Sequence, residues 1–231
     1  MSTADTGLGR VRVWDLPTRV FHWLLALSVI ASLVSAKIGG NAMDWHLRFG
    51  PLVLALLVFR LSWGLVGGHW SRFGKLLYAP RTVWRYVRGH SRPDEQHEVG
   101  HSPLGSLSVW ALLGFVALQV ATGLVADDEI ATVGPLNHLV SGALAERATH
   151  WHKNPGEWIV ITLLALHLLA VLFYATVRRK HLVRPMIDGD KWLPAHTPPS
   201  VDNLATRLLA LLLAALCGAG AVHAAKISIS C

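Results

Sequence analysis

Five long apolar stretches, separated by polar segments, constrain this chain more than any other feature of its sequence. The hydrocarbon core of a bilayer is about 30 Å thick, and about 20 apolar residues in a helix cross it. Four stretches approach or reach that length and a fifth is rich in Ala and Gly; they cover residues 20–35, 49–66, 104–126, 158–177 and 208–225. The pattern predicts an all-α integral membrane protein, a four-helix transmembrane bundle with a fifth, C-terminal transmembrane helix. We expect a transmembrane domain over 1–191, a Pro-rich linker over 192–207, and a hydrophobic helix and tail over 208–231.

Composition and charge also indicate a membrane protein. Hydrophobic residues make up 52% of the chain and charged residues 15%, whereas soluble domains carry about 25% charged residues. The ten Trp suit the membrane–water boundary. The two Cys exclude a disulfide framework, a CxxC metal site and a CxxCH haem motif. The net charge is +7, and the Lys and Arg residues that give it lie between apolar runs rather than on one folded domain. We therefore expect membrane lipid and not nucleic acid as a partner.

Basic residues predict the orientation of the helices. Lys and Arg are concentrated before the first stretch, between the second and third, and after the fourth. Such segments stay in the cytoplasm, so we expect a multi-pass membrane protein with a cytoplasmic N-terminus. A cleaved signal peptide is the alternative for the first stretch, but about twenty residues precede it, which favours a retained helix. Residues 80–89 and 134–150 are expected to form short helices on the cytoplasmic and outer faces.

Four histidines fall within or at the ends of these stretches. Ionisable residues at membrane depth are costly and usually functional. His22 lies near the cytoplasmic end of the first span, and His46 lies near the outer end of the second. His152 lies at the outer entry to the fourth span, and His167 lies about 22 Å deeper along it. This predicts two pairs, His22 with His167 inside and His46 with His152 outside. His150 is the fallback for His152, although on an ideal helix it is rotated further from His167, by about 100° rather than about 60°.

Paired imidazoles from different helices suit haem iron. Zinc usually recruits a third and fourth protein ligand, whereas haem needs two axial imidazoles and an apolar slot. The sequence therefore predicts two b-type haems, against the alternative of packed histidines bonded to backbone carbonyls. Arg19 and Arg60 are candidate partners of the anionic propionates, although Arg60 could instead extend to the headgroups. His101 is a weaker candidate for a group supporting the haem site.

The segments "VRVWDLPTRVFHW", "MDWHLRFG", "FRLSWGLVG", "LHLLAVLFY" and "LVRPMIDGDK" together resemble the bacterial cytochrome b561 family. That family includes the b-type membrane subunits of nickel hydrogenases, and the resemblance covers about residues 10–191. It implies that domain 1–191 is a di-haem cytochrome b whose iron ligands are His22, His46, His152 and His167. The gap between the last two is longer than is usual in the family, which leaves the choice between His150 and His152 open.

The resemblance also implies a function. We expect an electron carrier, or a subunit of a quinone-linked oxidoreductase, that transfers electrons across the membrane. One partner would be the quinone pool, with a quinone site near His167, and the other a periplasmic redox protein, c-type cytochrome or enzyme subunit. A superoxide or small-oxidant quinone oxidoreductase is an alternative, but the mildly acidic outer loops disfavour an anionic substrate. A non-redox membrane anchor is a second alternative.

Overall fold

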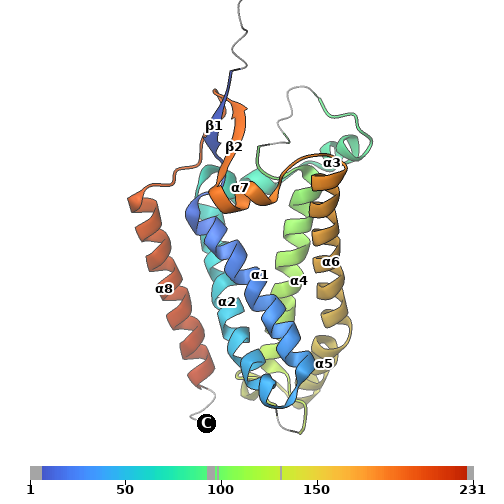
Figure 1. The fold of residues 1–231 in the computed structure, drawn as a ribbon. Helices are drawn as coiled ribbons and strands as arrows, with labels where there is room; N and C mark the ends of the chain where they lie inside the picture. The colour runs from blue at the N-terminus through green and yellow to red at the C-terminus, as the bar shows by residue number, and fades with distance from the viewer. Residues whose placement is uncertain (1–6, 93–96, 98, 131, 228–231) are drawn as a thin grey trace, which may run out of the picture. The chain divides into compact units, whose positions relative to one another are not determined.

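The structure, a computed structural model, describes residues 7–92, 97, 99–130 and 132–227. It is mainly helical, with one pair of short strands (Figure 1). The helices are α1 (Leu16–Ile38), α2 (Met43–Val66), α3 (Pro80–Val87), α4 (Pro103–Val125), α5 (Gly142–Lys153), α6 (Pro155–Thr176), α7 (Val183–Asp188) and α8 (Leu204–Ile227). The strands are β1 (Leu8–Arg12) and β2 (Asp190–Pro194), and short 3-10 helices cover Gly40–Ala42, His69–Ser71, Phe73–Leu76 and Asn137–Leu139.

The five predicted spans are confirmed as helices long and apolar enough to cross a membrane. Each helix begins before its apolar stretch: α1 begins at Leu16 and α2 at Met43. The apolar pattern marks only the residues that lipid or the core must cover, whereas the helix ends depend on capping and packing. The two short amphipathic helices are also present, as α3 and α5. The chain is therefore a multi-pass helical membrane protein.

The chain divides into two compact units, each built from separate segments. The first unit comprises Met1–Val20, Leu61–Val109 and Leu168–Ala210, and the second Phe21–Arg60, Trp110–His167 and Leu211–Cys231. In the second unit, parts of α1, α2, α4 and α6 run side by side (Figure 1). Their apolar side chains share one core, formed by Val29, Val53, Leu57, Val116 and Val160.

The first unit contains a β pair that the sequence analysis did not predict. Strands β1 and β2 are antiparallel, with Leu8 opposite Pro194 and Arg12 opposite Asp190. A two-stranded ribbon is marginally stable alone, and here it packs with a buried apolar cluster: Val11, Val13, Trp14, Val99 and Leu193. Residue 191, where the sequence analysis placed a domain boundary, lies inside β2. This strand pairs with β1, near the other end of the chain.

A buried carboxylate organises the start of α1. Asp15 is 0% exposed, and its Oδ1 accepts hydrogen bonds from the Thr18 backbone N–H at 2.8 Å and from Trp63 Nε1 at 3.0 Å. The Ser71 hydroxyl donates to Oδ2 at 2.6 Å. A Cβ at Gly68 would lie 2.3 Å from Oδ2, so only glycine fits there. Asp15 therefore caps α1 and holds its start against the end of α2.

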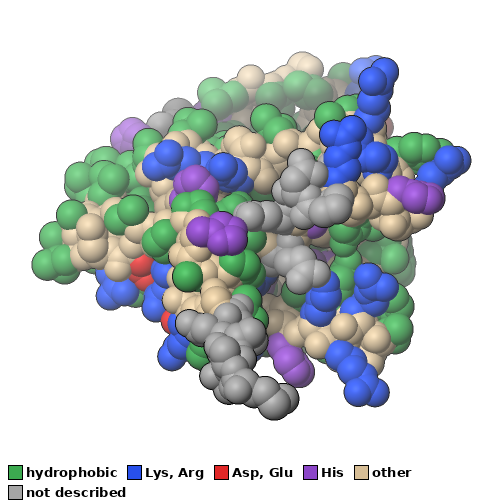
Figure 2. All heavy atoms as spheres, turned by 90° about the horizontal axis from the view of Figure 1, so that it is seen from above, with side chains coloured by type: hydrophobic (Ala, Val, Ile, Leu, Met, Phe, Trp, Pro, Cys, Tyr) green, Lys and Arg blue, Asp and Glu red, His purple; other side chains and the backbone are tan. Residues whose placement is uncertain are grey.

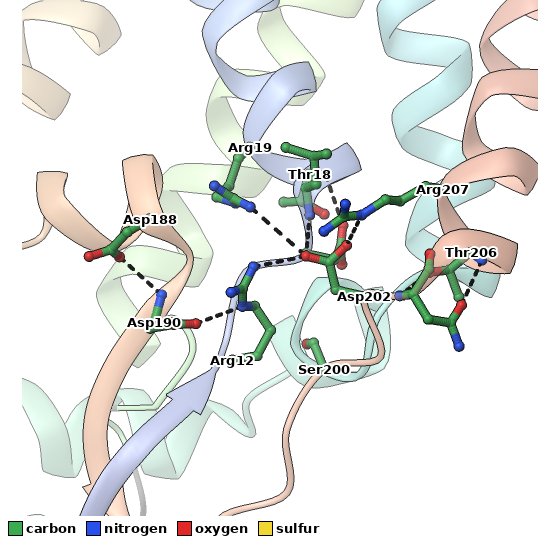
Figure 3. Close-up of polar contacts among 12 residues, drawn as sticks. Arg12, Thr18, Arg19, Asp188, Asp190, Ser200, Asp202, Thr206 and Arg207 are labelled. Carbon is green, nitrogen blue, oxygen red and sulfur yellow. Dashed lines mark hydrogen bonds and ion pairs between the residues drawn. The ribbon is translucent and has the colours of Figure 1, made fainter.

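A second carboxylate attaches the start of α8. The Asp202 side chain is 4% exposed and lies 2.9 Å from Arg12 Nη1, 2.8 Å from Arg207 Nε and 3.9 Å from Arg19 Nη2 (Figure 3). The backbone N–H of Leu16 also donates to it at 3.3 Å. Three guanidinium groups from β1, α1 and α8 thus share one carboxylate.

Stability should depend on pH through Asp202. Burial alone would raise the pKa of this carboxyl, but the hydrogen bond and charge of Arg207, the Leu16 N–H and Arg12 lower it overall. A depressed pKa contributes stability above the unfolded value, about 3.9, which is lost as pH falls through the folded pKa. We expect Asp202→Asn to destabilise the protein by about 1–2 kcal/mol at neutral pH, since the arginines are partly exposed and screened.

This prediction can be checked by unfolding the detergent-solubilised protein over a range of pH. The difference between wild type and Asp202→Asn should shrink below about pH 4. Glu146→Gln, at an exposed acidic residue of α5, is the matched control and should have little effect. A difference in stability between wild type and Asp202→Asn that persists undiminished to about pH 2 would contradict the lowered pKa of Asp202.

Candidate functional site

Four partly buried histidines lie in the second unit as two pairs. The ring centroids of His22 on α1 and His167 on α6 are 6.4 Å apart, with an interplanar angle of 52°. The centroids of His46 on α2 and His152 on α5 are 5.8 Å apart, with an angle of 74°. In each pair, the two rings come from different helices, and the structure brings together the same partners that the depth argument matched.

The backbone orients both rings of the His46/His152 pair. His46 Nδ1 lies 3.0 Å from the carbonyl oxygen of Ser32, and His152 Nδ1 lies 2.8 Å from that of Gln119. In the neutral tautomer in which Nδ1 donates to this carbonyl oxygen, Nε2 keeps its lone pair. His46 Nδ1 also lies 3.0 Å from the Ser32 hydroxyl, which can donate or accept. Histidines that bind metals are commonly held in this way, because the hydrogen bond fixes both tautomer and ring orientation.

The His22/His167 pair lies in an aromatic setting. The His22 ring meets Trp23 edge-on, with ring centroids 5.2 Å apart. Its Nδ1 is buried and has no hydrogen-bond partner among the residues that the structure describes. The rings of Phe21 and Phe59 are 6.2 Å apart, so Arg60, the next residue on α2, lies at the level of His22. Arg60 is 5% exposed, so a buried cation lies on α2 at about this level.

Both pairs fit a haem with two axial imidazoles. An imidazole nitrogen binds a metal at about 2 Å, and its ring centre lies roughly 1 Å further away, so two coaxial ligands have centroids roughly 6 Å apart. Both measured separations are close to this. No group of three or more His, Cys, Asp or Glu that could hold a metal occurs among the described residues. Gly50, one turn after His46, has open space where a Cβ would lie, as a porphyrin beside the helix requires.

The structure separates His152 from His150. The His150 side chain is exposed, whereas His152 faces His46. The helix-rotation argument for choosing between them does not apply, because α5 ends at Lys153 and α6 begins at Pro155. Asn154 between them has φ −116° and ψ −93°, which is not helical. His152 and His167 therefore lie on two helices joined by a break, not on one continuous span.

The other predicted residues have defined contacts. Arg19 donates to the Ile187 carbonyl oxygen on α7 and lies near Asp202, which precedes α8, in the first unit. Arg60 is buried rather than extended toward headgroups. His101 packs against Trp14 in the first unit, with ring centroids 4.8 Å apart.

Sequence reasoning missed two features of α4 that position His152. The carbonyl of Gln119 accepts its hydrogen bond, and the Gln119 side-chain amide donates to the His152 carbonyl oxygen at 2.7 Å. A Cβ at Gly123 would lie 2.6 Å from His152 Cε1. The only sequence signal was a polar residue and a glycine four residues apart in an apolar run, which alone does not indicate a contact.

Imidazole pairs between apolar membrane helices are typical of a membrane-bound b-type cytochrome. The chain belongs to the prokaryotic cytochrome b561 family, which it matches over residues 13–189. Membership implies haem b as the cofactor. The match ends before Asp202 and α8, so both lie outside it.

Several relatives are hydrogenase B-type cytochrome subunits by name. A probable Ni/Fe-hydrogenase B-type cytochrome subunit of Bradyrhizobium diazoefficiens is 24% identical over 225 residues, covering 82% of this chain and 90% of the relative. One from Azotobacter chroococcum is 26% identical over 213 residues, with 78% and 87% covered. The probable Ni/Fe-hydrogenase 1 B-type cytochrome subunit of Escherichia coli K12 is 21% identical over 213 residues, with 77% and 88% covered.

Proposed function

We propose that this chain binds two haems b and transfers electrons between them across the bacterial inner membrane. His22 and His167 ligate one iron, and His46 and His152 ligate the other. The observation that carries the proposal is the presence of two imidazole pairs with ring separations suited to axial ligation. Each bound haem accepts and donates one electron, while the protein supplies the ligands, their spacing and an apolar environment.

The distribution of charge supports an orientation. Exposed Lys and Arg side chains gather on the face seen in Figure 2, and those of the first unit include Arg72, Lys75, Arg81, Arg88, Arg92, Arg178, Arg179 and Arg184. Segments rich in these residues stay in the cytoplasm. In the proposed arrangement the N-terminus is cytoplasmic, and the His22/His167 haem is nearer the cytoplasm than the His46/His152 haem. The buried Arg60 binds a propionate of the former.

The names of the relatives suggest the partners. Because they are called hydrogenase B-type cytochrome subunits, we propose a hydrogenase subunit as the partner at the outer face. It exchanges electrons with the His46/His152 haem, and the His22/His167 haem exchanges them with membrane quinone. His167 on α6 is the ligand nearest the proposed quinone site.

The proposal is tested on purified protein in detergent or nanodiscs. A pyridine haemochrome assay should give two haems b per chain, and a quinol analogue should reduce haem at a rate that depends on its concentration. Hydrogenase with hydrogen should reduce the haems through the other face. One haem per chain would overturn the ligand assignment, and haem that neither a quinol nor hydrogenase reduces would overturn the electron-transfer role.

Gly123→Ala should selectively remove the His46/His152 haem. The added methyl group would lie 2.6 Å from His152 Cε1, closer than carbon atoms pack, so the imidazole must move off its axis. We expect haem content to fall by about half, because changes in the residues that orient a metal ligand reduce metal affinity about 10- to 100-fold. Gly218→Ala, at an α8 glycine with open space beside it, is the control. Full haem content in Gly123→Ala would show that His152 is not a ligand in this position.

A further inference from the structure

The two histidine pairs of the second unit differ in what their Nδ1 atoms contact. His46 Nδ1 lies 3.0 Å from the Ser32 carbonyl oxygen, and His152 Nδ1 lies 2.8 Å from that of Gln119. His22 Nδ1 is buried, and none of the described residues offers it a hydrogen-bond partner. Because all five residues belong to the second unit, the two pairs can be compared directly.

The difference affects how strongly each pair donates electrons to iron. When Nε2 of a neutral imidazole ligates a metal, the remaining proton lies on Nδ1, which then acts as a donor. In His46 and His152 this proton faces a backbone carbonyl oxygen, and the Ser32 hydroxyl is equally near His46 Nδ1, at 3.0 Å. A hydrogen bond donated by Nδ1 makes Nε2 more basic. A more basic ligand stabilises ferric over ferrous iron, which lowers the reduction potential of the haem.

Nearby charges act in the same direction. Arg60, on α2 at about the level of His22, is 5% exposed, and a buried cation favours the iron state with less positive charge. As the proposed partner of a propionate, it also offsets the negative charge of that group. At the other pair, the charges of Glu157 and Lys153 both act on His152, with opposite signs. The charge acting on His152 is thus mixed in sign, whereas the buried charge of Arg60 is positive.

We propose that these contacts give the His46/His152 haem the lower reduction potential, so that an electron moves favourably from it to the His22/His167 haem. This inference rests on the proposed function and gives the transfer a direction. One ferrous iron is oxidised to ferric, and the same electron reduces the other iron from ferric to ferrous; no bond is made or broken. Ser32 and Gln119 act through the imidazoles that they contact, so they are positioning residues.

The test is a redox titration of the full-length, haem-loaded protein, followed by its absorption spectrum. His22→Ala retains the His46/His152 haem and His46→Ala retains the other, so each potential is measured alone. We expect the potential of the His46/His152 haem to be lower by about 59 mV or more, which corresponds to an equilibrium constant of about ten for a one-electron transfer. Equal potentials, or the reverse order, would overturn the inference.

Gln119 allows one pair to be altered alone. Its side-chain amide donates to the His152 carbonyl oxygen at 2.7 Å, and its own carbonyl oxygen faces His152 Nδ1. Gln119→Leu removes the first contact, and the second should lengthen because α4 then holds His152 less firmly. The lower potential in the titration of the two-haem protein should rise, while the higher one stays unchanged. Leu118→Ala, at an exposed neighbour on α4, is the matched control and should change neither.

Arg60 is tested in the same titration. Arg60→Gln removes the charge and should lower the potential of the His22/His167 haem, whereas Arg60→Lys keeps the charge and should stay closer to the wild-type value. Neither variant should shift the other haem. A wild-type potential in Arg60→Gln would contradict the effect assigned to this cation.

Failure of the inference can be distinguished from failure of the proposed function. A wild-type protein with fewer than two haems would contradict the ligand assignment, and with it the proposed function. Two haems whose potentials lie in the wrong order would overturn only the direction of transfer. If a histidine variant does not accumulate, the Gln119→Leu titration decides: a shift confined to the higher potential, or no shift, would overturn the inference.

Discussion

Replacing His22 or His167 with Ala is expected to remove one haem, and replacing His46 or His152 is expected to remove the other. Each variant should contain about half the wild-type haem, because a haem held by one imidazole in an apolar slot dissociates readily. Within a pair, the two single variants should leave the same residual absorption spectrum. The double variant of a pair should resemble the single variants, since one loss already removes the haem.

The pairing is tested by comparing variants across the two pairs. His22→Ala combined with His46→Ala should lose both haems, whereas His22→Ala combined with His167→Ala should lose one. His150→Ala is the matched control, because this exposed residue lies on the same helix as His152 and should keep full haem content. If His22→Ala and His46→Ala left identical spectra, the pairs would be wrongly assigned. Haem loss in His150→Ala would argue against His152 as the ligand.

Asp15→Ala is expected to be the most destabilising substitution in the first unit. It removes the acceptor of three hydrogen bonds, and the Trp63 indole N–H and the Ser71 hydroxyl would lose that partner in a buried site. Hydrogen bonds to a charged group contribute about 1.5–3 kcal/mol each, and they do not add fully, so we expect a loss of about 3–5 kcal/mol. This is a large share of a total stability of about 5–15 kcal/mol, and little protein should accumulate in the membrane.

A second variant should lose less stability than Asp15→Ala. Asp15→Asn keeps the shape and one carbonyl acceptor, so it should accumulate and unfold at a temperature between those of the wild type and Asp15→Ala. Asp44→Ala, at an exposed acidic residue in the first turn of α2, should change stability by less than about 0.5 kcal/mol. Thermal unfolding followed by tryptophan fluorescence measures all three. Equal stabilities for Asp15→Ala and Asp44→Ala would show that the Asp15 hydrogen bonds do not stabilise the fold.

The spans could be predicted because they depend on a local property. A run of apolar residues long enough to cross a bilayer can be read without knowing its neighbours, and five such runs became helices. The family was recognisable for a related reason, since its motifs lie in and beside those spans. The strand pair and the Asp202 cluster could not be predicted, because each joins residues from opposite ends of the chain.

The arrangement of the histidines depends both on their positions in the sequence and on contacts in the tertiary structure. Sequence position and helix rise placed His22 and His167 at one depth and His46 and His152 at another, but the preference for His152 over His150 rested on an uninterrupted helix. The structure has a break at Asn154, so rotation along one helix cannot decide which ring turns inward. The carbonyl of Gln119 on α4, and the space that Gly123 leaves, orient His152 toward His46.

By itself, the sequence determined the helical membrane class and the number of candidate spans, and it predicted a depth for each histidine, because hydropathy, charge and helix rise are set by residues close together along the chain. Only the tertiary structure decided which imidazole faces its partner, and how Asp15 and Asp202 join distant segments. These arrangements depend on contacts between helices, whose rotations and breaks no local pattern specifies.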